Sequence, residues 1–270
     1  MTSVLILAGA RDEPCPLCEE AGVSSKALLR IANSRMIDHV LRAVRDCAEL
    51  DGTVWVSGMD AADIATGAPD DLVEFAGRLK TAPVGDGPAT ASLAALDAGA
   101  EFPLLITTCD HPLLTPDMVS SFLHESEREG SDISVGLASS TVIQDAYPDV
   151  KRTYIKLAGH RYSGCNLFHA KTEGARKGIE FWRTVGRDRK KPMKIAQRLG
   201  YGMLFRALTG RLGLRDAFAH GSDLVGAEIS PILIPIAEAA IDVDKPGDLA
   251  LVKKILEKQG KVQPAAGLPY

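Results

Sequence analysis

The sequence is poor in aromatic residues and has no long apolar run. Aromatic side chains make up 5% of the 270 residues, and no stretch approaches the roughly 18 apolar residues that a membrane span needs. Met1-Thr2-Ser3 lacks the positive charge that opens a signal peptide, and the apolar stretch that follows is too short for one. We therefore expect a cytoplasmic protein without a transmembrane segment.

An excess of charge of one sign is lacking as well. The chain holds 31 Lys and Arg residues against 35 Asp and Glu residues, for a net charge of −4. Such a balance gives no global field that would attract nucleic acid or an anionic membrane. We expect no nucleic-acid partner, and any cationic site must be local.

Cysteine is scarce, and its spacing does not resemble a secreted disulfide framework, so we expect free thiols. The five cysteines are Cys15, Cys18, Cys47, Cys109 and Cys165. A Cys-x-x-Cys pair such as Cys15 and Cys18 can be half of a zinc site or a redox pair. No second pair or suitably spaced histidine follows it, and a thioredoxin-type pair would open a helix, whereas this one lies in a predicted loop.

The chain does contain a regular alternation of strand-like apolar runs and helical patterns. Strands are predicted over residues 4–7, 53–57, 103–107, 133–137 and 240–243, and helices over residues 36–47, 89–98, 116–129 and 246–258. Residues 154–169 are predicted to form a hairpin-like elaboration. The alternation predicts an α/β protein with a Rossmann-like, mostly parallel sheet flanked by helices on both faces.

We expect a single domain over residues 1–260, a basic helical insert at about 171–220 and a disordered tail over 261–270. The basic residues of the insert are Arg183, Arg187, Arg189, Lys190, Lys191, Lys194 and Arg198. They could grip an anionic acceptor or simply form a solvated helix face. Residues 199–214 mix Leu, Met, Phe and Arg, which would also allow contact with a membrane surface.

Ligands of open parallel sheets bind beyond the carboxyl ends of the strands, so the residues after each predicted strand are the candidate site. The loop Leu7-Ala8-Gly9-Ala10 follows the first strand, and its small residues would let backbone N–H groups approach phosphate oxygens. Arg11 and Lys26 would add positive charge. The alternative is an ordinary surface loop with unrelated charges.

Three acids follow other predicted strands. Asp110 comes directly after the run 103–107, while Asp242 and Asp244 are two residues apart and would point the same way on an extended segment. Carboxylates in such places can hold Mg²⁺ together with substrate phosphates. Alternatively, Asp110 caps a turn in which His111 is a turn residue, and Asp244 caps the helix that begins at Lys245 or Pro246.

A glycine-rich turn over residues 85–92 contains Gly87 and Pro88. It could lay backbone against a nucleotide base or sugar. It could equally serve as the entry to the helix that begins there.

These segments, taken in order, resemble the nucleotidyltransferase superfamily that includes molybdenum-cofactor guanylyltransferases, cytidylyltransferases and sugar-phosphate nucleotidyltransferases. The closest resemblance is to the MobA-like NTP transferases. The matching segments are Leu7-Ala8-Gly9-Ala10-Arg11, Ser25-Lys26-Ala27-Leu28-Leu29, Gly87-Pro88, Cys109-Asp110-His111-Pro112-Leu113 and Asp242-Val243-Asp244-Lys245-Pro246-Gly247-Asp248-Leu249. The chain departs from the family pattern where Ala10 replaces one of two adjacent glycines and where residues 12–24 form a long acidic loop.

The resemblance implies a GT-A-like nucleotidyltransferase fold and a Mg²⁺-dependent reaction. A nucleoside monophosphate would pass from an NTP, with GTP or CTP favoured, to a phosphorylated small-molecule acceptor, and pyrophosphate would leave. Lys26 and Arg11 would contact phosphate oxygens, Leu7-Ala8-Gly9-Ala10 and Gly87-Pro88 would contact the nucleotide, and no general base would be needed.

The resemblance also implies that Asp110 and Asp244 bind the metal, with Asp242 in a supporting metal-binding or an orienting role. Gly164 and Asn166 stand where family members contact the acceptor, although Gly164 could instead serve tight strand packing. Two other interpretations stay open: a GT-A-type glycosyltransferase, which would use a mid-chain Asp-x-Asp where this chain has the lone Asp110, and a nucleotide-binding regulatory protein without turnover.

Overall fold

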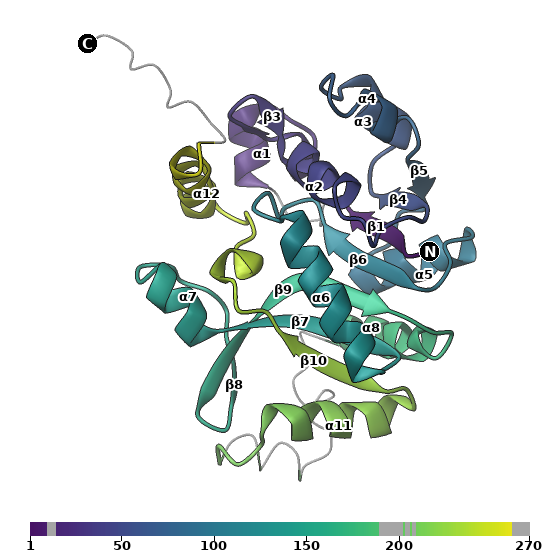
Figure 1. Ribbon diagram of the computed structural model, residues 1–270, viewed down its shortest axis with the longest axis vertical. Helices are drawn as coiled ribbons and strands as arrows, with labels where there is room; N and C mark the ends of the chain where they lie inside the picture. Colours follow the sequence, from purple (N-terminus) through teal and green to yellow (C-terminus); the bar gives the residue numbers. More distant parts are fainter. Residues whose placement is uncertain (10–14, 189–201, 203–205, 207–208, 261–270) are drawn as a thin grey trace.

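Eight of the strands in the described residues hydrogen-bond into one mixed sheet with helices on both faces (Figure 1). The computed structural model describes residues 1–9, 15–188, 202, 206 and 209–260. In these residues the main strands are β1 (Ser3–Leu7), β4 (Val54–Ser57), β5 (Lys80–Ala82), β6 (Leu104–Thr108), β7 (Ile133–Ser139), β8 (Ile155–Leu157), β9 (His160–Ala170) and β10 (Ile229–Leu233). A separate small ladder joins β2 (Arg30–Ile31) to β3 (Ser34–Arg35).

The sheet order is β10-β7-β9-β6-β1-β4-β5, with β8 paired to β9. The pairs β1–β4, β1–β6, β4–β5 and β7–β10 are parallel, whereas β9 runs antiparallel to both β6 and β7. The predicted α/β class and mostly parallel sheet are therefore confirmed, with β9 as the reversed strand.

The α-helices are α1 (Pro16–Ala21), α2 (Met36–Arg45), α3 (Ala61–Thr66), α4 (Val73–Ala76), α5 (Pro88–Asp97), α6 (Pro116–Glu129), α7 (Ser140–Ala146), α8 (Ala175–Asp188), α11 (Leu214–Val225) and α12 (Pro246–Lys258). Two short 3-10 helices are η1 (Lys26–Leu28) and η2 (Ala237–Ala240). Thr115 caps α6, because its hydroxyl accepts the N–H of Met118 at 3.3 Å.

Alternate residues of the central strands face opposite helical layers. Val4 and Ile6 of β1 belong to the core that contains α2 and α6, while Leu5 belongs to the core that contains α5 and α8. This period of two is the pattern of a strand buried on both faces. Figure 1 shows α6 lying across one face of the sheet.

A third apolar cluster, which we call the terminal cluster, joins the two ends of the described chain. It comprises Leu17, Leu29, Ile31, Met36, Leu113, Ile241, Val243, Val252, Ile255 and Leu256. Its members come from α1, the residue after η1, β2, the start of α2, the loop after β6, the extended residues before α12, and α12 itself. Residues widely separated in the sequence are therefore packed together beside one edge of the sheet.

Two predicted elements differ from the structure. The predicted strand over 240–243 is wrong: η2 is followed by extended residues that join no ladder in the described chain, although the Val243 N–H donates to the Asp110 carbonyl at 2.9 Å. The predicted hairpin over 154–169 is present as β8 and β9, which Ala158 and Gly159 join with positive φ values of 45° and 80°. However, β9 continues between β7 and β6, so it is part of the main sheet and not an elaboration.

The expectation of free thiols holds for Cys47, Cys109 and Cys165 but is wrong for the other two cysteines. Cys15 and Cys18 form a disulfide, and Cys15 is the N-cap of α1. The pair therefore does open a helix. Sequence periodicity missed α1 because six residues are too few to show a helical pattern.

The predicted basic insert contains α8 and most of α11. Its basic run over 189–198 lies outside the described residues, as do Ala10, Arg11, most of residues 199–208 and the tail over 261–270. The extent of the domain, of its insert and of its tail therefore stays a prediction. In the described ranges, no helix is long and apolar enough to cross a membrane.

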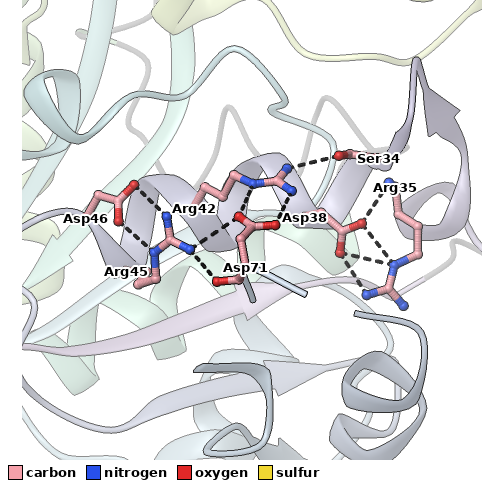
Figure 2. Close-up of polar contacts among 7 residues, drawn as sticks. All are labelled: Ser34, Arg35, Asp38, Arg42, Arg45, Asp46 and Asp71. Carbon is pink, nitrogen blue, oxygen red and sulfur yellow. Dashed lines mark hydrogen bonds and ion pairs between the residues drawn. The ribbon is translucent and has the colours of Figure 1, made fainter. Parts of the chain in front are cut away.

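An ion-pair network fastens α2 to the segment that carries α3 and α4 (Figure 2). Arg42 donates to both carboxylate oxygens of Asp71 at 2.7 and 2.8 Å, and Arg45 donates to the Asp71 backbone carbonyl at 2.7 Å. Hydrogen bonds from Arg42 lower the pKa of Asp71 to about 2. At the other end of α2, the buried Arg35 pairs with Asp38 at 2.7 Å and donates to the Ile64 carbonyl at 2.9 Å.

A buried polar group lies between α6 and the sheet. His169 of β9 is 1% exposed, and its Nδ1 lies 2.9 Å from the hydroxyl of Ser126, which donates to Ser134 at 2.8 Å. Burial, aided by the positive charge of Lys171, lowers the pKa of His169 to about 4. The imidazole is therefore neutral in the folded protein at neutral pH.

We expect this histidine to make the stability depend on pH. The folded His169 resists protonation until about pH 4, whereas an unfolded histidine takes a proton near 6.5. The stabilisation is thus present above pH 6.5 and lost as the pH falls toward 4, by roughly 3 kcal/mol. In denaturant unfolding across this range, the free energy of unfolding of His169→Asn should depend less on pH than that of the wild type. His160→Asn, at an exposed site, should show the same pH dependence as the wild type. Equal slopes for His169→Asn and the wild type would contradict this account.

Candidate active site

The carboxyl ends of four parallel strands meet at one edge of the sheet. Leu7 of β1 is in register with Ser57 of β4 and with Thr108 of β6, and β5 continues the parallel set. The pairing extends past the strands, since Ala8 donates to the Ser57 carbonyl at 2.7 Å and Cys109 donates to the Leu7 carbonyl at 3.0 Å. The opening loop and the Asp110 loop therefore leave the sheet side by side, as ligand sites of such sheets require.

The opening loop is packed against a glycine that the sequence analysis missed. Gly58 has a φ of +94°, and a Cβ atom there would lie 2.2 Å from the Cα of Gly9. Only glycine can adopt that conformation and allow so close an approach. The signal was the Ser57-Gly58 step at the end of a strand. Leu7, Ala8 and Gly9 thus lie at the expected edge, while Ala10 and Arg11 are outside the described residues.

Ser25, the N-cap of η1, holds Lys26 beside this loop. The Ser25 hydroxyl accepts the Ala27 N–H at 3.3 Å and donates to the Ala8 carbonyl at 3.4 Å. The Lys26 ammonium Nζ then lies 2.6 Å from Asp244 Oδ1 and 3.7 Å from Asp110 Oδ2. The structure therefore brings together three of the predicted site residues, from opposite ends of the sequence.

The surrounding carboxylates keep Lys26 charged. Burial alone would lower the pKa of this lysine, but the hydrogen bond to Asp244 and the charges of Asp110 and Asp244 outweigh burial and raise it. A fixed positive charge at this place is suited to bind phosphate oxygens.

The Asp110 carboxylate is largely buried, with its side chain 19% exposed. Burial raises its pKa, and the nearby carboxylates of Asp242 and Asp244 act in the same direction. Its Oδ1 is buried and has no hydrogen-bond partner among the described residues. An orphaned carboxylate oxygen of this kind fits a hard cation such as Mg²⁺.

The described residues do not form a ready-made metal cluster of three or more ligands. Mg²⁺ commonly takes one or two carboxylates and fills its remaining positions with water and substrate phosphates. Asp110 and Asp244, whose carboxylates both lie near the Lys26 ammonium, could supply these one or two carboxylate ligands. The predicted metal role of these two acids therefore fits the donor set, and it stays a prediction.

Asp242 is held by protein donors on both carboxylate oxygens. Arg152 Nη2 pairs with its Oδ1, and the Asn166 side-chain amide donates to its Oδ2 at 2.9 Å. Between the two roles considered for Asp242, this geometry favours the orienting one. Arg152, whose side chain is 11% exposed, was missed because this loop arginine belongs to no recognisable motif.

Asn166 reaches Asp242 because β9 carries a bulge. The pairing moves from Val135–Phe168 to Leu137–Gly164, so that β9 advances four residues while β7 advances two. Asn166 lies in this bulge with a φ of 51°, a left-handed conformation that asparagine tolerates better than most residues. Gly164 is exposed, and a Cβ there would meet no described atom within 4 Å, so tight packing does not explain it.

The segment that carries Asp244 is fixed by Asp248. This carboxylate accepts the N–H groups of Asp244 and Lys245, both at 3.1 Å, at the start of α12. Lys245 is the N-cap, so the alternative in which Asp244 caps the helix is wrong. The Asp244 carboxylate turns to Lys26 instead.

Two other predicted features are clarified by the structure. Pro88 is the first residue of α5 and Gly87 its N-cap, while a Cβ at Gly85 would lie 2.3 Å from the Ala91 nitrogen, so the turn is folded tightly on the helix. His111 is buried, with its Nε2 3.2 Å from the Glu238 carbonyl, and its own carbonyl accepts the Leu114 N–H at 3.1 Å, so it is a buried residue that begins a turn. A nucleotide contact by Gly87-Pro88 stays a prediction.

We expect Gly58→Ala to cost more stability than the same change at Gly99. Gly99 also has a positive φ, of 105°, but a Cβ there would meet no described atom within 4 Å. Gly99→Ala should therefore lose only the conformational cost of about 1 to 2 kcal/mol, and Gly58→Ala should add the clash with Gly9. Denaturant unfolding of both variants measures the difference, and equal losses would mean that the Gly9 contact is unimportant.

The chain was compared with known proteins by sequence and by structure. Comparison of the sequence with curated proteins gives no significant match. A hypothetical transferase from Thermus thermophilus is 28% identical, with a TM-score of 0.75, over 92% of this chain and 99% of that chain.

Two more distant structures share the fold. CMP:2-keto-3-deoxy-manno-octonic acid synthetase in complex with CTP is 12% identical, with a TM-score of 0.58, over 96% of this chain and 98% of that one. The 2-C-methyl-D-erythritol 4-phosphate cytidylyltransferase of Thermus thermophilus is 16% identical, with a TM-score of 0.51, over 94% and 98%. The family model for the MobA-like NTP transferase domain matches residues 5–221, a range that includes Lys26 and Asp110 and ends before Asp242. The chain therefore belongs to the MobA-like NTP transferase family.

Proposed function

We propose that the protein transfers a nucleoside monophosphate from an NTP, with CTP or GTP as the favoured donors, to a phosphorylated small-molecule acceptor. The observation that carries the proposal is the position of Lys26. Its ammonium lies 2.6 Å from Asp244 and 3.7 Å from Asp110, beside the glycine loop at the carboxyl edge of the sheet. One fixed cation among carboxylates suits a triphosphate together with a divalent metal ion.

In the proposed reaction an oxygen of the acceptor phosphate attacks the α-phosphorus of the NTP. The bond from the α-phosphorus to the bridging oxygen breaks, and pyrophosphate leaves with the electron pair. An acceptor phosphate is already ionised at neutral pH, so the protein needs no general base. Its contribution is positioning and neutralisation of charge.

Lys26 would hold phosphate oxygens of the NTP, because its raised pKa keeps it charged throughout the neutral range. The backbone N–H of Gly9, and Arg11 beyond it, would add further phosphate contacts, whereas the Ala8 N–H already donates to the Ser57 carbonyl. A Mg²⁺ ion bound by Asp110 and Asp244 would neutralise charge on the triphosphate and on the leaving pyrophosphate.

Asp242 would act on the metal-binding acids without binding the metal itself. Asp242 is held by Arg152 and Asn166, and it raises the pKa of the neighbouring Asp110. We assign it the role of orienting the metal-binding acids. Asn166 and the exposed Gly164 lie two residues apart in β9 and are the proposed acceptor contacts.

The first test is binding of ATP, GTP, CTP and UTP in the presence of Mg²⁺, measured by calorimetry. One nucleotide should bind selectively, and Lys26→Ala and Asp110→Ala should each weaken it by at least about tenfold, or 1.4 kcal/mol. Removal of Mg²⁺ with a chelator should weaken it as well. Lys156→Ala and Asp63→Ala, at exposed positions, are the matched controls and should bind as the wild type does.

Pyrophosphate release with a panel of sugar phosphates and other phosphorylated acceptors then separates the interpretations. Release that depends on the acceptor supports transfer. Selective binding without release from any acceptor would favour the regulatory alternative, and turnover of a nucleotide sugar would favour the glycosyltransferase. No binding, or binding indifferent to Lys26 and Asp110, would overturn the site assignment.

Variants of Asn166 should show whether this residue orients Asp242 or only contacts the acceptor. Asn166→Gly keeps the left-handed backbone but removes the amide, and Asn166→Ala removes both. If orientation of Asp242 matters, both should lower kcat by about tenfold or more, because a misplaced group of this kind typically costs tenfold to a hundredfold. A rise in the acceptor KM with kcat unchanged would instead assign Asn166 to acceptor binding alone.

A further inference from the structure

The disulfide between Cys15 and Cys18 sets this segment apart from the other cysteines of the chain. The two Cα atoms are 5.2 Å apart, within the range that a disulfide needs. Cys15 is the N-cap of α1, Pro16 is its first residue, and Cys18 follows in the first turn. Residues three apart at a helix start lie on one face, so the local fold itself brings the two sulfur atoms together.

The two cysteines are not equivalent. Cys15 is partly exposed, whereas Cys18 is 8% exposed. The Cys18 backbone N–H donates to the Cys15 sulfur at 3.3 Å. The thiolate is the reactive species of a cysteine, and a partner from solution reaches an exposed sulfur more readily than a buried one. Cys15 is therefore suited to react first with a partner from solution, and the more buried Cys18 is suited to complete the exchange.

The other three cysteines are unsuited to the same chemistry. Cys47, Cys109 and Cys165 are all buried. Burial raises the pKa of each thiol, to about 12 for Cys47 and for Cys165. They are neutral and shielded at neutral pH, so thiol–disulfide exchange in this protein is confined to Cys15 and Cys18.

We propose that Cys15 and Cys18 form a reversible dithiol–disulfide site that exchanges with low-molecular-weight disulfides of the glutathione type. In the oxidising direction the Cys15 thiolate attacks one sulfur of the small disulfide, a mixed disulfide forms, and one thiolate leaves. The Cys18 thiolate then attacks the Cys15 sulfur, the bond between Cys15 and Cys18 forms, and the second thiolate leaves. The protein loses two electrons and two protons, and the small disulfide gains them as two thiols.

The site lies next to the residues proposed for transfer. Leu17, between the two cysteines, is buried in the terminal cluster with Val243, which separates Asp242 from Asp244. The Val23 N–H donates to the Cys18 carbonyl at 2.9 Å, so α1 leads directly into the turn before Lys26. The exchange chemistry itself needs none of the transfer residues.

The test is equilibration of the full-length protein with glutathione buffers of graded composition, followed by acid quenching, alkylation under denaturing conditions and mass spectrometry of the peptides. In wild-type protein, alkylation of Cys15 and Cys18 should be lost together as oxidised glutathione increases, and should return together when reduced glutathione is restored. Cys47→Ser is the matched control and should titrate as the wild type does.

Single variants test the order of attack. Cys18→Ser should accumulate a glutathione mixed disulfide on Cys15, at a level at least tenfold above that on Cys18 in Cys15→Ser. The proposal is overturned if the pair never oxidises, if it cannot be reduced again, or if the two variants form the adduct equally. Because the readout is covalent and needs no nucleotide, a negative result is distinct from failure of the proposed transferase activity.

Discussion

The packing of the terminal cluster is the constraint on which the site depends. Lys26 and Asp244 are separated by 218 positions in the chain, and both sit beside members of this cluster, Leu29 and Val243. A partly exposed ion pair contributes only about 0 to 1 kcal/mol, whereas burial of one large apolar side chain contributes about 1.5 to 3 kcal/mol. Apolar packing of the terminal cluster therefore contributes more than the ion pair to holding Lys26 next to Asp244.

The carboxylates around the site differ in how many protein hydrogen-bond donors they have. Asp242 and Asp248 have several protein donors, while Asp110 keeps a buried carboxylate oxygen without a partner among the described residues. Leaving a buried acceptor unsatisfied typically costs about 1 to 3 kcal/mol. A stable fold retains such a feature most readily where it serves binding, which is why this acid is central to the proposed mechanism.

Much of this arrangement follows from the sequence. The apolar run at Val4 to Leu7 predicts a buried strand, and the position of Asp110 after such a strand predicts its place at the ligand edge. Arg152 was beyond prediction, because a single loop arginine carries no periodic signal and finds Asp242 only through tertiary folding. The role of Asn166 was hidden in the same way, since it depends on a bulge that shifts the register of β9.

The position of the acids at the far end of the chain also governs when the site can exist. Chains are synthesised from the N-terminus, and early segments can fold before later ones emerge. Lys26 and Asp110 are made well before Asp242, Asp244 and α12, whose Val252 and Ile255 complete the terminal cluster. A chain that lacks these residues would carry Lys26 and Asp110, one half of the charge arrangement, without the half that completes it. The part of the site that depends on Asp242, Asp244 and α12 can therefore form only after these residues have been made.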